Sequence, residues 1–300
     1  MNTRKLIVSL LLAIVGMVST ALADTTQRQA TVASVTGNAT VTMPDGTTAV
    51  LAAGMKVPQG ATINTGADGD VLLESHAGYV TSIKRNSIVL VEEISVTANN
   101  GKVVKENTTL DLKGGNLVAM LDPKKKAINN YQVRTPKGVA AARGTVFTIT
   151  VQIGTSTVTI AVVNGSITVN STGNELGGQS LTVNAGQVTS DGQAVTALSA
   201  SQAELLAVVA AAAAVAADKG LISSAEAQQV ASNIVTAVPA AASAVKEAVQ
   251  QSAPNQAAAI NSSVDTAAAT STSTVTVPAT TPTTPVTDVT VRSGSGGPGS

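Results

Sequence analysis

The sequence predicts a mainly β protein: a unit of many short strands, arranged as a sandwich, a roll or a short β-solenoid, followed by Ala-rich α-helices and a disordered tail. Val, Thr and Ile are dense over residues 28–198, and turn residues interrupt them at short intervals. Alanine dominates residues 200–268 and favours helix. Residues 269–300 are rich in Thr, Ser, Pro and Gly, which bury too little apolar surface to offset the entropy of ordering.

Composition excludes several classes of function. Among 300 residues there is no cysteine and one histidine, and only 12% of the residues are charged. Disulfides, thiolate nucleophiles, iron–sulfur clusters and two-histidine metal sites are therefore excluded. A formal net charge of zero gives no overall positive field to hold nucleic acid. We expect a protein that is not an enzyme, takes no cofactor and binds no nucleic acid.

Residues 1–23 have the pattern of an export signal. A short basic start, Arg4-Lys5, precedes an apolar run over residues 6–18, and Ala21-Leu22-Ala23 offers the small residues that a signal peptidase accepts. The alternative is an uncleaved membrane anchor, but the run is shorter than the roughly 20 residues that span a bilayer. We expect cleavage before Asp24, a periplasmic or secreted protein, and no later segment apolar and long enough to cross a membrane.

Turn residues divide residues 28–198 into strands. Pro44-Asp45-Gly46, Asn99-Asn100-Gly101 and Asn164-Gly165 each separate two apolar runs, as the tips of β-hairpins do. Residues 145–151 alternate with a period of two, which places Phe147 and its alternate neighbours on one face of a strand. With so few aromatic residues, the core of this unit is expected to be aliphatic.

Capping signals divide the Ala-rich region into helices. Ser201 with Glu204, and Ser223 with Glu226, have capping-box spacing, and Lys219-Gly220 is a helix stop. Pro239 and Pro254 end the second and third helices, and a short fourth helix follows. Because alanine offers little area to bury, these helices should pack closely on small side chains or fold only weakly.

Three motifs have a chemical interpretation and a simpler structural one. His76 could be a general base or a metal ligand, but a surface histidine in a turn is favoured, because the chain has no second histidine. Asp68-Gly69-Asp70 could offer carboxylates to calcium, but it lacks the ligand spacing of a calcium loop and is read as a solvated turn. The Gly-rich stretch over residues 173–178 lacks the Lys of a phosphate loop and is read as a hairpin tip.

The one run of charge, Lys124-Lys125-Lys126 after Asp122-Pro123, leaves two interpretations open. It could contact an anionic partner, such as a polysaccharide or an acidic protein surface. Alternatively, it is a solvated loop whose lysines protect a strand edge from pairing with another chain.

The most constrained stretch of the chain runs over residues 134–147. Pro136 restrains the preceding residue to an extended conformation, and Gly144 allows another backbone to approach closely. Arg143 lies among small residues, as an arginine held for bidentate contacts does. An architectural role with a buried partner is favoured for it, and contact with a ligand is the alternative. The motif residues are Arg134, Thr135, Pro136, Gly138, Arg143, Gly144, Thr145 and Phe147.

This block resembles the signature of the FecR domain. The stretches 60–66, 110–121, 162–169 and 183–187 also follow the family's order, so the resemblance spans roughly residues 55–190 of an all-β unit over 28–198. The resemblance implies an extracytoplasmic β module without catalytic residues. In the best-known members, this module relays a signal from a TonB-dependent receptor to a sigma factor.

The chain also departs from that family pattern. Five residues precede its apolar run, so we expect a stand-alone exported form without the cytoplasmic anti-sigma segment. The favoured function is a non-enzymatic binding or scaffold protein of the bacterial cell envelope, with an envelope protein or glycan as partner. The alternatives are a periplasmic sensor in receptor and sigma-factor signalling and, more remotely, an enzyme acting on envelope polysaccharide.

Overall fold

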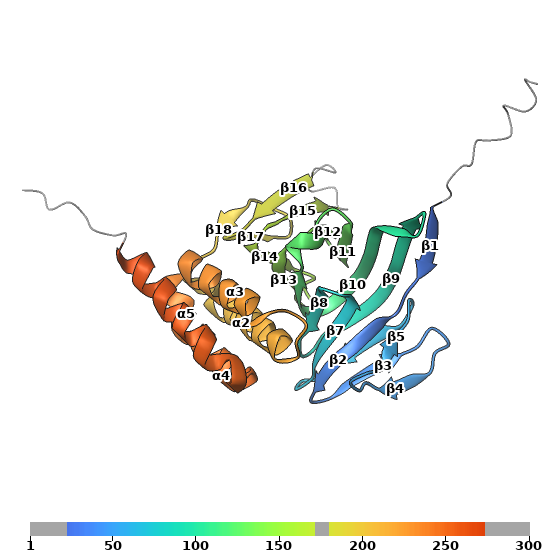
Figure 1. Cartoon of the computed structure of the whole chain (residues 1–300), viewed down its shortest axis with the longest axis horizontal. Helices are drawn as coiled ribbons and strands as arrows, with labels where there is room; N and C mark the ends of the chain where they lie inside the picture. The colour runs from blue at the N-terminus through green and yellow to red at the C-terminus, as the bar shows by residue number, and fades with distance from the viewer. Residues whose placement is uncertain (1–22, 172–179, 274–300) are drawn as a thin grey trace, which may run out of the picture.

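The computed structural model describes residues 23–171 and 180–273 (Figure 1). The predicted signal segment, the Gly-rich stretch over 173–178 and the tail beyond residue 273 lie outside the described residues. Within them, the prediction of a mainly β protein with C-terminal helices is confirmed: the strands of two sheets precede every α-helix.

Sheet A presents one face to solvent. Its strands are β1 (Asp24–Gln27), β3 (Ala39–Thr42), β4 (Thr48–Val50), β6 (Thr62–Thr65), β9 (Ile88–Asn99), the first part of β10 (Lys102–Leu121), β11 (Asn129–Thr135), β12 (Gly138–Ala142), β15 (Ser166–Ser171) and β16 (Ser180–Asn184). Neighbouring strands are antiparallel, except that β11 runs parallel to β10.

Sheet B lies between sheet A and the helices. Its order is β5 (Lys56–Val57), β2 (Ala30–Thr36), β7 (Asp70–His76), β8 (Tyr79–Ile83), the second part of β10, β13 (Val146–Val151), β14 (Val158–Asn164), β17 (Gln187–Ser190) and β18 (Thr196–Ala197). All of its pairings are antiparallel.

Strand β10 belongs to both sheets and joins them. Gly114 pairs with Ile88 in sheet A, whereas the next residue, Gly115, pairs with Val151 in sheet B. Gly115 has a φ of +96°, and a Cβ there would lie 2.2 Å from the Ser87 Oγ. Only glycine tolerates this crossing, because it has no side chain and adopts a positive φ at little cost.

Alternation along β10 divides the apolar side chains between two cores. Leu117, Ala119 and Leu121 face the core between the two sheets, whereas Val118 and Met120 face the helices. The inter-sheet core is mostly aliphatic, as expected. It also holds all three aromatic residues of the chain, Tyr79, Tyr131 and Phe147, each at most 1% exposed.

Two of the three predicted hairpin turns are confirmed, because β3 pairs with β4 and β9 pairs with β10. Asn100 and Gly101 both have positive φ, 49° and 75°, which is the combination that a tight two-residue hairpin needs. Gly46 also has a positive φ, and the Asp45 carboxylate accepts the Thr47 amide at 2.9 Å. The expectation of a hairpin at Asn164-Gly165 is wrong: β14 pairs within sheet B and β15 within sheet A, so this turn joins the two sheets.

The helices form a layer on the outer face of sheet B (Figure 1). Helices α2 (Ala203–Asp218) and α3 (Ser224–Ala237) contact β10 and β14, and α4 (Ala242–Ser252) and α5 (Pro254–Ser273) pack outside them. Short 3-10 turns, Ala200–Gln202 and Pro239–Ala241, precede α2 and α4. The last helix is longer than expected and includes the first residues of the predicted tail.

One predicted cap is confirmed and the other is shifted. The amide of Ser223 donates to Glu226 Oε2 at 2.7 Å, and the Glu226 amide donates to Ser223 Oγ at 3.2 Å. The expectation of a Ser201–Glu204 box is wrong: Ser199 is the capping residue, and its amide donates to Gln202 Oε1 at 2.9 Å. The 3-10 turn before α2 moves the start of the helical segment back by two residues.

Small side chains let α2 lie deep between sheet B and the outer helices. Ala210, Ala213, Ala214 and Ala216 are at most 1% exposed. The stretch Ala200–Asp218 has a mean hydropathy of 1.7 and is long and apolar enough to cross a membrane. This corrects the expectation that no segment after the predicted signal segment is long and apolar enough to cross a membrane. In the structure, 56% of the stretch is buried within the protein.

Candidate functional site

The first half of the signature block is architectural. Thr135 Oγ1 donates to the Gly138 carbonyl at 2.9 Å across the β11–β12 turn. Gly138 has a φ of +151°, and a Cβ there would lie 2.3 Å from the Asn170 carbonyl of β15. Arg134 Nε lies 2.6 Å from Glu92 Oε2 on the outer face of sheet A, in a half-exposed ion pair.

Arg143 corrects the expectation of a buried arginine. Its side chain is exposed and has no hydrogen bond or ion pair with the described residues. The chain crosses here from β12 in sheet A to β13 in sheet B, and the constraint falls on the two following residues. Gly144 has a φ of +62°, and a Cβ there would lie 2.7 Å from Pro123 Cα. Thr145 is fully buried, and its Oγ1 donates to the Ser166 carbonyl at 3.0 Å.

The lysine run folds into a 3-10 turn, Pro123–Lys125, packed against Gly144. Asp122 caps this turn, because its Oδ1 accepts the Lys124 amide at 2.8 Å. Lys125 turns inward: its Nζ lies 3.3 Å from Glu106 Oε2 and 5.3 Å from the centre of the Tyr79 ring. Lys124 and Lys126 are exposed and form no ion pair with the described residues. The run thus combines one internal lysine with two exposed ones.

His76 is not the surface histidine that its turn residues suggest. It is 8% exposed, its Nε2 lies 2.9 Å from the Asn107 carbonyl, and its ring packs edge-on against Tyr79. Burial lowers the pKa of His76, which outweighs the raising effects of the Asn107 carbonyl and the Glu106 charge. Burial and the nearby Glu106 carboxylate raise the pKa of Tyr79.

The Asp68-Gly69-Asp70 turn uses its carboxylates to fix the backbone. Asp68 Oδ1 accepts the Asn38 amide at 3.2 Å and the Asn38 side chain at 3.1 Å, which lowers the pKa of Asp68. Asp70 pairs with Lys84 at 2.6 Å. Over residues 23–171 and 180–273, no three His, Cys, Asp or Glu side chains gather in a way that could hold a metal ion.

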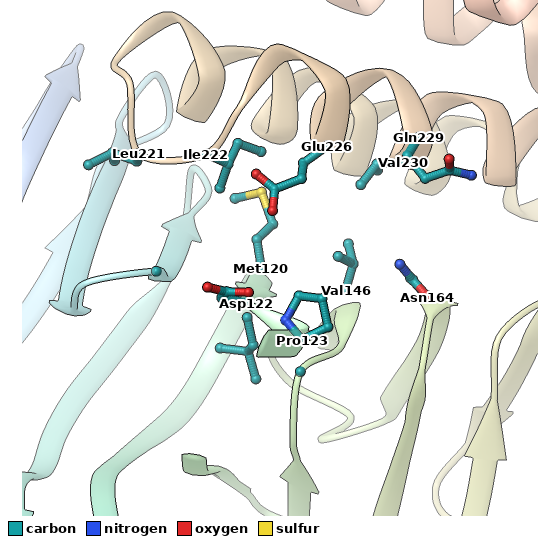
Figure 2. A pocket seen from close by; sticks show the side chains of 13 residues that line it. Met120, Asp122, Pro123, Val146, Asn164, Leu221, Ile222, Glu226, Gln229 and Val230 are labelled. Carbon is teal, nitrogen blue, oxygen red and sulfur yellow. The ribbon is translucent and has the colours of Figure 1, made fainter. Parts of the chain in front are cut away.

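A cleft of about 130 Å³ separates this end of sheet B from the first turns of α3 (Figure 2). One wall consists of the Pro123–Lys125 turn, Gly144 and Gly78, which lies in the turn between β7 and β8. Apart from Pro123 of that wall, six apolar residues line the cleft: Met120, Leu121, Val146, Leu221, Ile222 and Val230. Four polar side chains join them: Asp122, Asn164, Glu226 and Gln229.

Each carboxylate of the cleft has one oxygen without a hydrogen-bond partner in the part of the chain that the structure describes. Glu226 extends from α3 toward Asp122, and the amide of Asn164 points up toward the same helix (Figure 2). Within the described residues, Asp122 uses Oδ1 and Glu226 uses Oε2 for capping. The backbone and hydroxyl of Ser223, and more weakly the charge of Lys124, lower the pKa of Glu226. Lys124 directly follows Pro123, which lines the cleft.

The sequence does not predict this cleft. The capping-box spacing identifies Glu226 as a cap but gives no sign that α3 lies over sheet B. Met120 reads as an ordinary strand residue, and Asn164 reads only as part of a turn. Their proximity to α3 depends on how the helical layer docks, for which the sequence carries no local signal.

Comparison with known proteins identifies the β unit. Residues 61–168 match the family model described as FecR protein, which confirms the predicted resemblance. No curated protein matches the chain. Similar solved structures include two of a proposed anti-sigma factor from Parabacteroides distasonis ATCC 8503, each 10% identical, with TM-scores of 0.36 and 0.30. The matches cover 45% and 59% of this chain, and the chain spans about three fifths of those structures, 59% and 60%.

Proposed function

The chain carries a FecR domain, and we propose that it is a non-enzymatic, extracytoplasmic protein-binding module of the cell envelope that takes part in regulatory signalling. One observation carries this proposal. At one end of the β unit, the Pro123–Lys125 turn and the loop around Gly144 pack against each other and have constrained backbones. These loops present Lys124, Lys126 and Arg143 to solvent without ion-pair partners among the described residues. We call these three residues the basic rim.

Rigid loops favour this surface for binding. Gly144 packs on Pro123, and Asp122 caps the turn that bears the lysines, so little conformational entropy is lost when a partner binds. Unpaired cations on such loops favour an acidic protein surface and accelerate its association. The export pattern of residues 1–23 supports an extracytoplasmic location.

A protein partner is favoured over a glycan. Sugar-binding surfaces use exposed aromatic rings that bury large apolar area, and all three aromatic residues of this chain are at most 1% exposed. Three side chains that could perform acid–base chemistry have structural partners. His76 is bonded to the Asn107 carbonyl, and Asp122 and Glu226 cap helical turns.

Charge reversal tests the basic rim. We expect Lys124→Glu/Arg143→Glu to lose at least tenfold in capture of its partner from envelope extracts, whereas Lys102→Glu/Lys105→Glu leaves capture unchanged. Lys102 and Lys105 are also exposed but lie near the β9–β10 hairpin. The proposal is contradicted if both double variants lose partner capture equally, or if neither loses it.

The identity of the captured protein tests the regulatory part. A TonB-dependent receptor or a signalling protein supports regulatory signalling. Recovery of structural envelope proteins alone supports a scaffold role and contradicts the signalling part. Release of the partner by a glycan, rather than by added salt, contradicts the protein-partner assignment, because contacts between exposed charges weaken as salt is added.

A further inference from the structure

The cleft beside the basic rim has the composition of a side-chain pocket. Met120 and Val146 of sheet B and Val230 of α3 are at most 9% exposed and give the cleft an apolar lining on both sides. Its volume of about 130 Å³ is close to the roughly 150 Å³ of apolar cavities that accept a benzene molecule. One aliphatic side chain of the size of Leu or Met therefore fills it.

The polar groups at the cleft match the backbone of an extended peptide. Asp122 Oδ2 and Glu226 Oε1 are acceptors left over from capping, and the Asn164 side chain has no hydrogen-bond partner within the described residues. An extended segment presents both N–H and C=O groups beside each side chain that it inserts. The carboxylate oxygens can accept its N–H groups, and the Asn164 amide can donate to its C=O or accept its N–H.

We propose that this cleft binds one aliphatic side chain of an extended, acidic segment of the partner protein, with the flanking acidic residues meeting Lys124, Lys126 and Arg143. This inference rests on the proposed function and adds the chemistry of the partner. A basic segment is disfavoured because its side chains would meet the three exposed cations of the rim.

Methionine methyl resonances give a direct test in the full mature chain. Met43, Met55 and Met120 are the methionines beyond the predicted signal segment, and only Met120 lines the cleft. The probe is a nine-residue peptide with a central Leu and Asp or Glu on both sides. We expect it to shift the Met120 signal and to leave the signals of Met43 and Met55 unchanged.

Two further peptides test the chemistry of the segment. Replacing the central Leu by Ala should weaken binding at least tenfold, because the cleft is left unfilled. Replacing the flanking acids by Lys should abolish the shift. The inference is overturned if the Met120 signal stays unchanged with the acidic Leu peptide, if the Ala peptide binds equally well, or if the Lys peptide binds equally well.

Filling the cleft separates this inference from the proposed function. We expect Ile222→Trp, at a half-buried position of the cleft, to weaken both peptide binding and partner capture at least tenfold. The matched control is Val139→Trp, at a half-buried position on the outer face of sheet A, which should change neither. Circular dichroism and melting temperature check that both variants fold.

The outcomes distinguish the two claims. If Ile222→Trp leaves partner capture intact while Lys124→Glu/Arg143→Glu abolishes it, the cleft inference fails and the basic rim stands. If neither change affects capture, the proposed function fails as well.

Discussion

At the scale of single residues, the signature block divides into positions that shape the backbone and one that does not. Gly138 and Gly144 occupy positive-φ positions against neighbouring backbone, and Thr145 is buried in a hydrogen bond. Arg143 lies between them in sequence but is exposed. The small residues beside Arg143 suggest a buried arginine, but in the structure they lie where the chain crosses from sheet A to sheet B.

This division predicts opposite effects on stability. Gly144→Val forces a β-branched residue to a φ of +62° and places its Cβ against Pro123, so the free energy of unfolding should fall by about 2 kcal/mol or more. Arg143→Ala should change it by less than about 0.5 kcal/mol. Urea denaturation of both variants measures the difference. A large loss in Arg143→Ala would show that its side chain has a structural partner after all.

His76 predicts a loss of stability in mild acid. Since burial lowers its pKa below the ordinary 6.5, the unfolded chain binds the proton more readily than the folded protein. The free energy of unfolding should therefore decrease as the pH falls from 7 to 5. Glu106, Lys125 and Arg28 are the charged groups whose fields reach His76.

Thermal unfolding of His76→Gln tests this cause. Glutamine can keep a donor toward the Asn107 carbonyl but does not titrate. The variant should show a smaller decrease in melting temperature between pH 7 and pH 5 than the unmodified protein. Identical decreases would assign the acid sensitivity to other groups.

At the scale of elements, the sequence predicts what is locally encoded. The Asn100-Gly101 turn and the Ser223 cap follow from the conformations and hydrogen bonds available to those residues. The alternation of residues 145–151 identifies Phe147 as a core residue. The burial of His76 was not predictable in this way, because it depends on the Asn107 carbonyl, 31 residues away in the chain.

The cap of α3 gives a prediction at this scale. Ser223→Ala removes the hydroxyl that accepts the Glu226 amide and should lower the free energy of unfolding by about 1 kcal/mol. Ser243→Ala is a suitable control, because Ser243 is exposed within α4 and alanine has a higher helix propensity than serine. Chemical denaturation that shows equal effects in both variants would contradict the capping role.

At the scale of the whole molecule, the Ala-rich helices complete the β unit. Sheet B has apolar residues on both faces, as the alternation of Leu72 with Leu73 and of Val118 with Leu117 shows. The sequence predicts helices after the strands but not where they dock, because small alanines encode no particular partner. The candidate cleft belongs to this docking and could not be predicted from the sequence for the same reason.

Removal of the helical layer tests this view. A fragment of residues 24–198 should keep its β circular dichroism but expose the outer face of sheet B, including Val80, Val118 and Met120. We expect it to bind the dye ANS and to aggregate more readily than the mature chain, because it gains a contiguous apolar patch. A fragment that stays monomeric and does not bind the dye would show that the helices are dispensable for the β unit.

The most direct measurement of the central claim is photo-crosslinking in the native cell envelope. A photoreactive amino acid is placed at Lys126, in the basic rim, and separately at Lys105, which is also exposed but lies near the β9–β10 hairpin. Binding through the basic rim predicts a covalent adduct with one protein from position 126 and none from position 105. No protein adduct from position 126, or the same adducts from both positions, would contradict it.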